Sequence, residues 1–236
     1  MSNDSNDTST WRNTLLQGFR GGLIASVQAY VGEPLRHPET MAQMARACEL
    51  GGAVAIRCQG LADIAAIKGR VEVPVIGLWK EGHDGVYITP TVRHAVACVN
   101  AGADIVAADA ADAPRPDGSS FADIVKAVHD AGALVMADCA SLEDIDRGFE
   151  AGADLVSTTL SHGTAAIDCG IADGPDLGLL QAAASKYPGR PVICEGRVHT
   201  PADARAALDA GAWAVVAGTA ITHPTSITSW FVDALA

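Results

Sequence analysis

One pattern recurs along the chain and limits the folds that it can adopt. A short apolar run, rich in β-branched residues, is followed by a polar stretch and an alanine-rich segment, and small residues lead into the next run. The pattern occurs eight times, with apolar runs at Leu23–Gln28, Ala53–Cys58, Pro74–Lys80, Asp104–Ala108, Leu134–Cys139, Leu155–Leu160, Pro191–Gly196 and Ala214–Gly218. Near-continuous apolar runs are typical of parallel strands that helices cover on both faces.

The segments between the runs carry helix signals. We predict amphipathic helices at Pro38–Leu50, Phe121–Ala131 and Pro201–Ala210, with Ser141 and Thr200 as N-caps of two helices. Glycine follows the helical segment in five joints, Leu50–Ala53, Ala101–Asp104, Ala131–Ala133, Ala151–Asp154 and Ala210–Trp213. A glycine there can adopt the left-handed conformation that ends a helix without steric cost.

Eight strand–helix units in 236 residues predict an α/β fold with a single (β/α)8 TIM barrel. An open, doubly wound sheet is the alternative, but it needs a glycine-rich dinucleotide turn after the first strand, where the chain reads Ser26–Ala29. We expect the barrel to span residues 12–236 as one domain. The polar residues 1–11 are expected to form a disordered tail.

Charge and hydropathy restrict the partners. The formal charge of −12 argues against a nucleic-acid binder and against attraction to an anionic membrane. No apolar run approaches the roughly 18 residues of a membrane-spanning helix. The N-terminus lacks the features of a secretory signal peptide. The six cysteines form no CxxC pair and read as buried thiols, so we expect a cytoplasmic protein.

The active site of such a barrel lies at the C-terminal ends of its strands. Polar residues end most of the predicted strands: Gln28, Arg57, Lys80, Asp109, Asp138, Thr158, Thr159 and Glu195. A buried charge costs several kcal/mol unless it is paired. A structural ion pair explains any one of these residues, but the converging set favours an active site.

The last two strands carry a second signal. Gly196 and Arg197 follow the seventh strand, and Gly218 and Thr219 follow the eighth. Phosphate sites in this fold are commonly built from these two loops, because glycine lets backbone N–H groups approach an anion. We therefore predict an anion site there.

The histidines do not indicate a metal site. His37, His94 and His129 fall in helical segments and are expected at the surface. His83, His162, His199 and His223 follow strands but share no ligand spacing, so no metal is predicted. The missing dinucleotide turn likewise predicts no nicotinamide cofactor.

From about Gly21 to Leu235 the chain resembles the bacterial N-acetylmannosamine-6-phosphate 2-epimerases of sialic acid degradation. The resemblance lies in these segments: Gly22–Gln28, Ala53–Arg57, Pro74–Lys80, Tyr87–Thr91, Met136–Asp138, Thr158–Leu160, Glu195–Arg197 with Thr200–Pro201, and Gly218–Thr222. It implies a TIM-barrel enzyme that interconverts N-acetylmannosamine 6-phosphate and N-acetylglucosamine 6-phosphate without an organic cofactor.

The resemblance also implies roles. Lys80 and Glu195 match the proton-transfer pair of the family. The substrate-binding residues are expected to be Gln28, Arg57, Asp138, Thr159, Gly196, Arg197, Gly218, Thr219 and His223. The chain departs from the family pattern at Glu81–His83, Ala110–Ala113, His162–Thr164 and His223. His223 replaces an arginine, and histidine lacks the permanent, two-pronged charge of arginine.

Three alternatives remain open at this stage. One is an epimerase or isomerase of a related sugar without the 6-phosphate. The second is an aldolase-type barrel in which Lys80 forms a Schiff base. The third is a barrel that binds a sugar or a partner without catalysis. Trp230 and Phe231, near the C-terminus, fit either a contact in a homodimer or a cap on the barrel.

Overall fold

In the computed structural model, which describes residues 4–82, 85–161 and 174–236, eight parallel strands close into a barrel in chain order. The strands are β1 (Leu23–Val27), β2 (Ala55–Gln59), β3 (Val75–Leu78), β4 (Ile105–Asp109), β5 (Leu134–Asp138), β6 (Leu155–Ser157), β7 (Val192–Glu195) and β8 (Ala214–Ala217). Closure pairs β1 with β8, where Leu23 lies opposite Val215. The predicted (β/α)8 barrel is confirmed.

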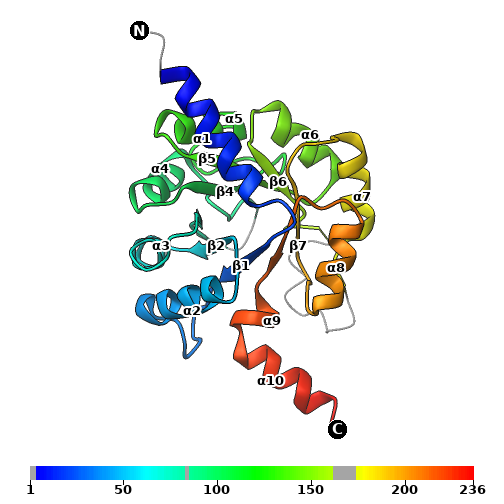
Figure 1. Cartoon of the computed structure of the whole chain (residues 1–236). Helices are drawn as coiled ribbons and strands as arrows, with labels where there is room; N and C mark the ends of the chain where they lie inside the picture. The colour runs from blue at the N-terminus through cyan, green and yellow to red at the C-terminus, as the bar shows by residue number, and fades with distance from the viewer. Residues whose placement is uncertain (1–3, 83–84, 162–173) are drawn as a thin grey trace.

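Helices alternate with the strands and cover the outer wall (Figure 1). They are α2 (Pro38–Leu50), α3 (Leu61–Lys68), α4 (Val92–Asn100), α5 (Phe121–Asp130), α6 (Leu142–Glu150), α7 (Leu177–Lys186) and α8 (Pro201–Asp209). Ser141 and Thr200 cap α6 and α8 as predicted, each in a capping box. The joint glycines Gly52, Gly102, Gly132, Gly152 and Gly211 all have φ between +86° and +108°, which confirms the left-handed helix ends.

Strand periodicity divides the core in two. Leu134 and Met136 of β5 pack inside the barrel, whereas Val135 and Ala137 face the helices. Asp138, the next inward position, is polar and fully buried. The barrel interior is therefore apolar along most of the strands and charged at their C-terminal end.

Helix α1 (Asp4–Gly18) crosses the opposite end of the barrel (Figure 1). Leu16 belongs to the interior apolar cluster, and its carbonyl accepts a 2.8 Å hydrogen bond from the Trp213 indole. Arg12 forms an ion pair with the buried Asp154. The helix includes residues 4–11, which were expected in a disordered tail, and the domain boundary at residue 12 stays a prediction.

Two helices follow β8, the short α9 (Thr219–Thr222) and α10 (Pro224–Asp233). Figure 1 shows α10 extending away from the barrel, on the side opposite the N-terminus.

In the described ranges, no helix combines the length and apolar character needed to cross a bilayer. Four cysteines are buried and Cys48 is half-buried, all as free thiols, while Cys169 lies outside the described residues.

Candidate active site

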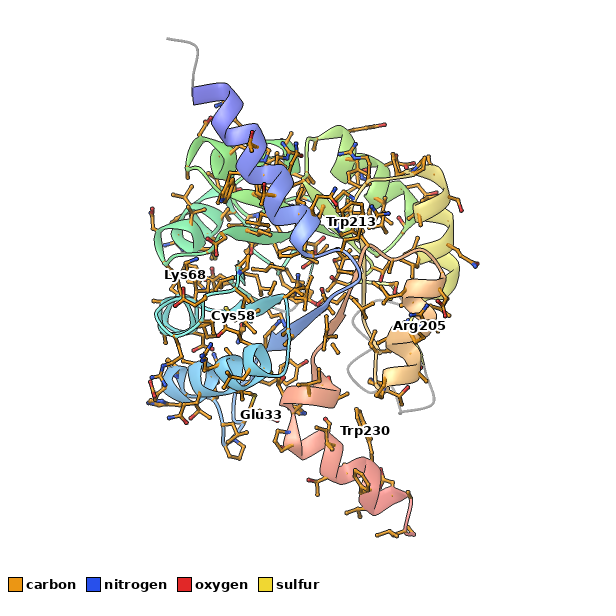
Figure 2. All side chains as sticks on the ribbon, viewed as in Figure 1. Glu33, Cys58, Lys68, Arg205, Trp213 and Trp230 are labelled. Carbon is orange, nitrogen blue, oxygen red and sulfur yellow. The ribbon has the colours of Figure 1, made fainter. Side chains whose placement is uncertain are left out.

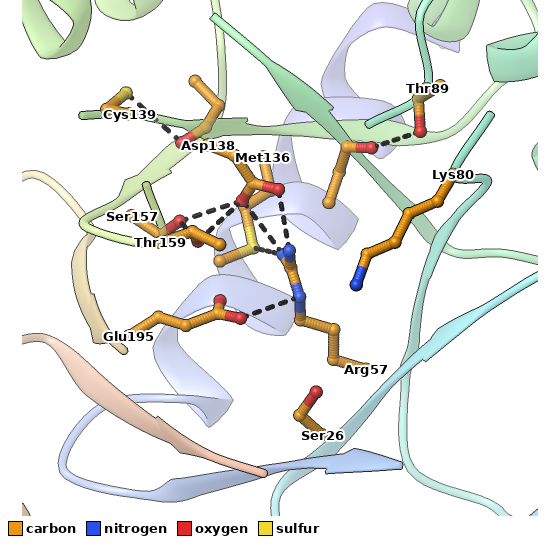
Figure 3. A network of polar contacts seen from close by, with 12 residues as sticks. Ser26, Arg57, Lys80, Thr89, Met136, Asp138, Cys139, Ser157, Thr159 and Glu195 are labelled. Carbon is orange, nitrogen blue, oxygen red and sulfur yellow. Dashed lines mark hydrogen bonds and ion pairs between the residues drawn. The ribbon is translucent and has the colours of Figure 1, made fainter. Parts of the chain in front are cut away.

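Arg57 is the centre of a buried charged layer at the C-terminal end of the barrel (Figure 3). Its Nη1 and Nη2 donate to the two carboxylate oxygens of Asp138, at 3.0 and 2.7 Å. Its Nε lies 3.1 Å from Oε1 of Glu195, an ion pair across the barrel. Burial acts to lower the pKa of Arg57, but the two carboxylates outweigh it and raise that pKa above the ordinary value.

Asp138 is fixed by hydroxyl groups from the neighbouring strand. Its Oδ1 accepts hydrogen bonds from the Ser157 hydroxyl at 3.0 Å and the Thr159 hydroxyl at 2.9 Å. Ser157 lies opposite Asp138 in the β5–β6 register, so the pairing of the strands places these groups together. Thr159 was predicted from the sequence to be in the site, and Ser157 was not.

Glu195 ends β7, and Thr158 holds its backbone. The Thr158 hydroxyl donates to the Glu195 carbonyl at 2.8 Å and accepts from the Glu195 N–H at 3.1 Å. No side chain of the described residues donates a well-aligned hydrogen bond to its buried Oε2. Burial raises the pKa of Glu195 to about 7, with Arg57 opposing the rise and Asp138 adding to it.

Lys80 follows β3 and reaches into the same space from the opposite side of the barrel. Its Nζ donates to Oε1 of Gln28 at 2.9 Å and lies 5.6 Å from the centre of the Tyr30 ring. Burial, together with the charge of Arg57, lowers the pKa of Lys80 to about 8, although Glu195 and Asp138 act against this. A lysine with such a pKa can both take and give a proton near neutrality.

An antiparallel contact that the sequence analysis missed holds Lys80 in place. Lys80 pairs with Ile88 in an antiparallel bridge. Next to it, the Thr89 N–H donates to the Trp79 carbonyl at 2.8 Å, and the Thr89 hydroxyl donates to the Ala107 carbonyl of β4 at 2.6 Å. Thr89 has φ of +48°, which is rare for a β-branched residue. Such strain persists where surrounding contacts enforce it, often at functional sites.

The two loops of the predicted anion site lie at the same end of the barrel. Gly196 has φ of +104°, and the Arg197 side chain donates to the carbonyls of Gly174 at 2.9 Å and Ser161 at 3.2 Å. Gly218 precedes Thr219, the first residue of α9; a Cβ at Gly218 would lie 3.2 Å from the Ser26 Cβ. Arg197 therefore ties loops together, and Gly218 keeps β8 close to β1.

His223 is engaged with the protein. Its Nε2 lies 2.8 Å from Oε2 of Glu33, and its Nδ1 accepts from the Ser226 N–H as the N-cap of α10. The ring meets Tyr30 edge-on with centroids 5.6 Å apart. The imidazole thus links the loop after β1 to the start of α10.

The other histidines do not gather around a common point. His94, expected at the surface, is buried: its Nδ1 lies 2.5 Å from the Thr91 hydroxyl, its Nε2 contacts Glu81, and the Trp79 ring packs against it. His83 and the segment 162–164 lie outside the described residues. Within the part of the chain that is described, no three His, Cys, Asp or Glu side chains are arranged to hold a metal ion. An enzyme without metal or cofactor stays a prediction.

A half-buried lysine and a buried glutamate, each with its pKa drawn toward neutrality at the mouth of a (β/α)8 barrel, define an enzyme site for acid–base chemistry. The family model described as "Putative N-acetylmannosamine-6-phosphate epimerase" matches residues 41–236. The chain belongs to this family and is therefore an epimerase, in the isomerase class.

Two curated relatives share this similarity over nearly their whole length. A protein of Cutibacterium acnes is 56% identical over 229 residues, which are 96% of this chain and 99% of that protein. One from Corynebacterium glutamicum is 47% identical over 232 residues, 97% of this chain and 99% of the relative. Both are named "Putative N-acetylmannosamine-6-phosphate 2-epimerase".

Among solved structures, the N-acetylmannosamine-6-phosphate 2-epimerase of Clostridium perfringens superposes with a TM-score of 0.85 at 39% identity. The match covers 93% of this chain and 96% of that chain. The resemblance expected from the sequence segments is thereby confirmed.

Proposed function

We propose that this chain interconverts N-acetylmannosamine 6-phosphate and N-acetylglucosamine 6-phosphate by moving a proton at C2. The observation that carries the proposal is the placement of Lys80 and Glu195 on opposite sides of the mouth, after β3 and at the end of β7, with pKa values of about 8 and about 7. The names of the relatives supply the substrate.

The chemistry needs two such groups. In the open-chain sugar, C2 is next to the C1 aldehyde, so loss of the C2 proton gives an enolate. One group removes the proton from one face and the other returns a proton to the opposite face, which inverts the centre. Lys80 and Glu195 serve as this pair, each acting as base in one direction and as acid in the other.

The neighbouring residues position the pair and the sugar. Arg57 already gives its donors to Asp138 and Glu195, so we assign it to holding the Glu195 carboxylate. Asp138 and Thr159 stabilise that arrangement from β5 and β6. Gln28 orients the Lys80 ammonium.

The 6-phosphate is assigned to the loops after β7 and β8. Backbone N–H groups at Gly196 and around Gly218 and Thr219 can approach an anion. Arg197 shapes the first loop through its bonds to Gly174 and Ser161. His223 stands at the edge of this site with Glu33 beside it, so its contribution to phosphate binding is weaker than that of an arginine.

A turnover assay tests the assignment. The protein is incubated with N-acetylmannosamine 6-phosphate and, separately, with N-acetylmannosamine, and the products are followed by NMR. We expect N-acetylglucosamine 6-phosphate from the first and much slower turnover of the second. Preferred turnover of the unphosphorylated sugar would favour the related-sugar alternative. A Lys80 adduct trapped with borohydride would favour the Schiff-base alternative.

We further propose a homodimer through α10. This helix has no buried residue, and its Phe231 and Val232 are 71% and 59% exposed. Figure 2 shows Trp230 beside the barrel, and its ring packs against His199 with centroids 4.8 Å apart, whereas Phe231 and Val232 have no such cover. An apolar groove of about 370 Å³ remains open beside β1 and α2, lined by Leu23, Ala25, Met44, Ala47, Cys48, Gly51, Ala53 and Ile221.

The groove is of the kind that a helix after β8 would fill in a regular barrel, so α10 of a second copy fits it. Light scattering of the protein is expected to give a dimer, and Phe231→Glu a monomer, with Lys126→Glu on the exposed face of α5 as the control. A monomeric parent protein would refute this arrangement.

We also propose a cytoplasmic location, in keeping with the buried free thiols.

A further inference from the structure

Asp109 ends β4 and takes no part in the mechanism described above. It lies opposite Asp138 in the β4–β5 register, and residues paired in register point to the same face of a sheet. Because Asp138 reaches Arg57 inside the barrel, the Asp109 carboxylate faces the same interior space. Only 3% of the residue is exposed.

The two oxygens of this carboxylate differ in their contacts. Oδ1 accepts a 2.8 Å hydrogen bond from the Ala111 N–H. Across residues 4–82, 85–161 and 174–236, nothing is hydrogen bonded to Oδ2 and no cation is ion-paired with the group. Arg115 donates to the backbone carbonyl of Asp109 instead. Asp109 is thus oriented by the backbone, with one oxygen left for a ligand.

Asp109 differs from the other two carboxylates at the barrel mouth in its ion pairing. Asp138 and Glu195 are both ion-paired with the guanidinium of Arg57, whereas the guanidinium nearest Asp109, that of Arg115, bonds to its backbone carbonyl and not to its carboxylate. A buried carboxyl that forms no ion pair is costly, and such groups cluster at functional sites. Burial raises the pKa of Asp109 to about 6, with the Ala111 N–H and the charge of Arg115 acting against the rise and Asp138 adding to it.

The proposed reaction contains a proton transfer that the C2 pair does not supply. The sugar phosphate is a cyclic hemiacetal in water, and its C2 proton becomes acidic only after the ring has opened to the aldehyde. Ring opening removes the proton from O1 and delivers one to O5. Lys80 and Glu195 must meanwhile keep the protonation states that the C2 step requires.

We propose that Asp109 is the acid–base residue that opens and closes the sugar ring, an inference that rests on the proposed function. In the opening direction its carboxylate takes the O1 proton, and the electron pair left on O1 forms the C1 carbonyl as the C1–O5 bond breaks. The new carboxylic acid then gives its proton to O5. No proton or electron is gained or lost overall, and ring closure is the reverse.

Exchange between the α and β anomers of N-acetylmannosamine 6-phosphate, measured by NMR saturation transfer, reports ring opening without epimerisation. Lys80→Ala is expected to form epimer at least ~100-fold more slowly yet still to accelerate anomer exchange, and Glu195→Gln provides a second variant with this property. Adding Asp109→Asn to either background should return exchange to the buffer rate. In the parent protein, Asp109→Asn should lower epimerisation about 100-fold.

Asp112→Asn is the matched control, because Asp112 is exposed in the same loop, and it should leave both rates unchanged. Circular dichroism checks folding, with Asp109→Ser as the second variant. The proposal is overturned if the double variants exchange anomers as fast as their backgrounds, if the backgrounds give no acceleration, or if Asp109→Asn epimerises at the parent rate. Failure of the proposed function is distinct, since the parent protein would then form no N-acetylglucosamine 6-phosphate.

Discussion

The Arg57 guanidinium donates two hydrogen bonds to the Asp138 carboxylate, at 2.7 and 3.0 Å, and both side chains are buried. Asp138→Asn removes one of the two carboxylates that balance the buried guanidinium. Removing one partner of a buried pair typically costs about 3–5 kcal/mol. We expect the free energy of unfolding, from urea titration, to fall by an amount of this order.

Asp209→Asn is the control for this variant, because Asp209 pairs with Arg205 on the exposed face of α8. Exposed pairs contribute little to stability. Equal unfolding midpoints for Asp138→Asn and the parent protein would show that the Arg57 pair does not stabilise the barrel.

Lys80→Ala and Glu195→Gln are each expected to reduce turnover at least ~100-fold, the usual scale for a general acid or base. Initial rates with N-acetylmannosamine 6-phosphate measure the effect. Lys126→Ala serves as the control, since Lys126 pairs with Asp130 at the surface of α5 and should leave the rate unchanged. Near-parent turnover in either site variant would remove that residue from the mechanism.

The rate should depend on pH with two limbs. Below about pH 7 both Glu195 and Lys80 hold protons, so the base is missing; above about pH 8 both have lost them, so the acid is missing. The profile of kcat/KM is therefore a bell with its maximum between these values, and the two pKa values belong to the pair. Glu195→Gln should replace the bell by a single limb in the profile of its residual activity, because Lys80 is then the one titrating group of the pair. A rate that rises steadily from pH 6 to 9 would be incompatible with this pair.

His223→Arg is expected to tighten binding of the 6-phosphate, because arginine offers a permanent, two-pronged charge. A charge-assisted hydrogen bond is worth roughly 1.5–3 kcal/mol, so KM should fall about 10-fold or more. The same change removes the acceptor that caps α10, so the melting temperature should fall slightly. An unchanged KM, together with good turnover of unphosphorylated N-acetylmannosamine by the parent, would refute the phosphate assignment.

Much of the fold was predictable because its signals are local. The Ser141 and Thr200 caps and the glycines at the helix ends depend only on neighbouring residues. The placement of Lys80 and Glu195 at the barrel mouth followed from the strand ends alone. Local patterns are sufficient where backbone geometry decides the outcome.

Other parts of the site depend on contacts between distant strands. The pairing of Arg57 with Asp138 joins β2 to β5 and arises only when the barrel closes. The left-handed Thr89 could not be read from a residue type that seldom adopts this conformation. His94 was misplaced because its burial comes from Trp79 in a different element, and the direction of α10 carries no local signal.

The most direct test of the two-group mechanism is the hydrogen at C2 of the product. The protein is incubated with N-acetylmannosamine 6-phosphate in deuterated water, and N-acetylglucosamine 6-phosphate is collected at low conversion. The account predicts deuterium at C2 in the first product formed, because the proton is returned by a group that exchanges with solvent. Product that keeps the original hydrogen at C2 would contradict transfer by Lys80 and Glu195 from opposite faces.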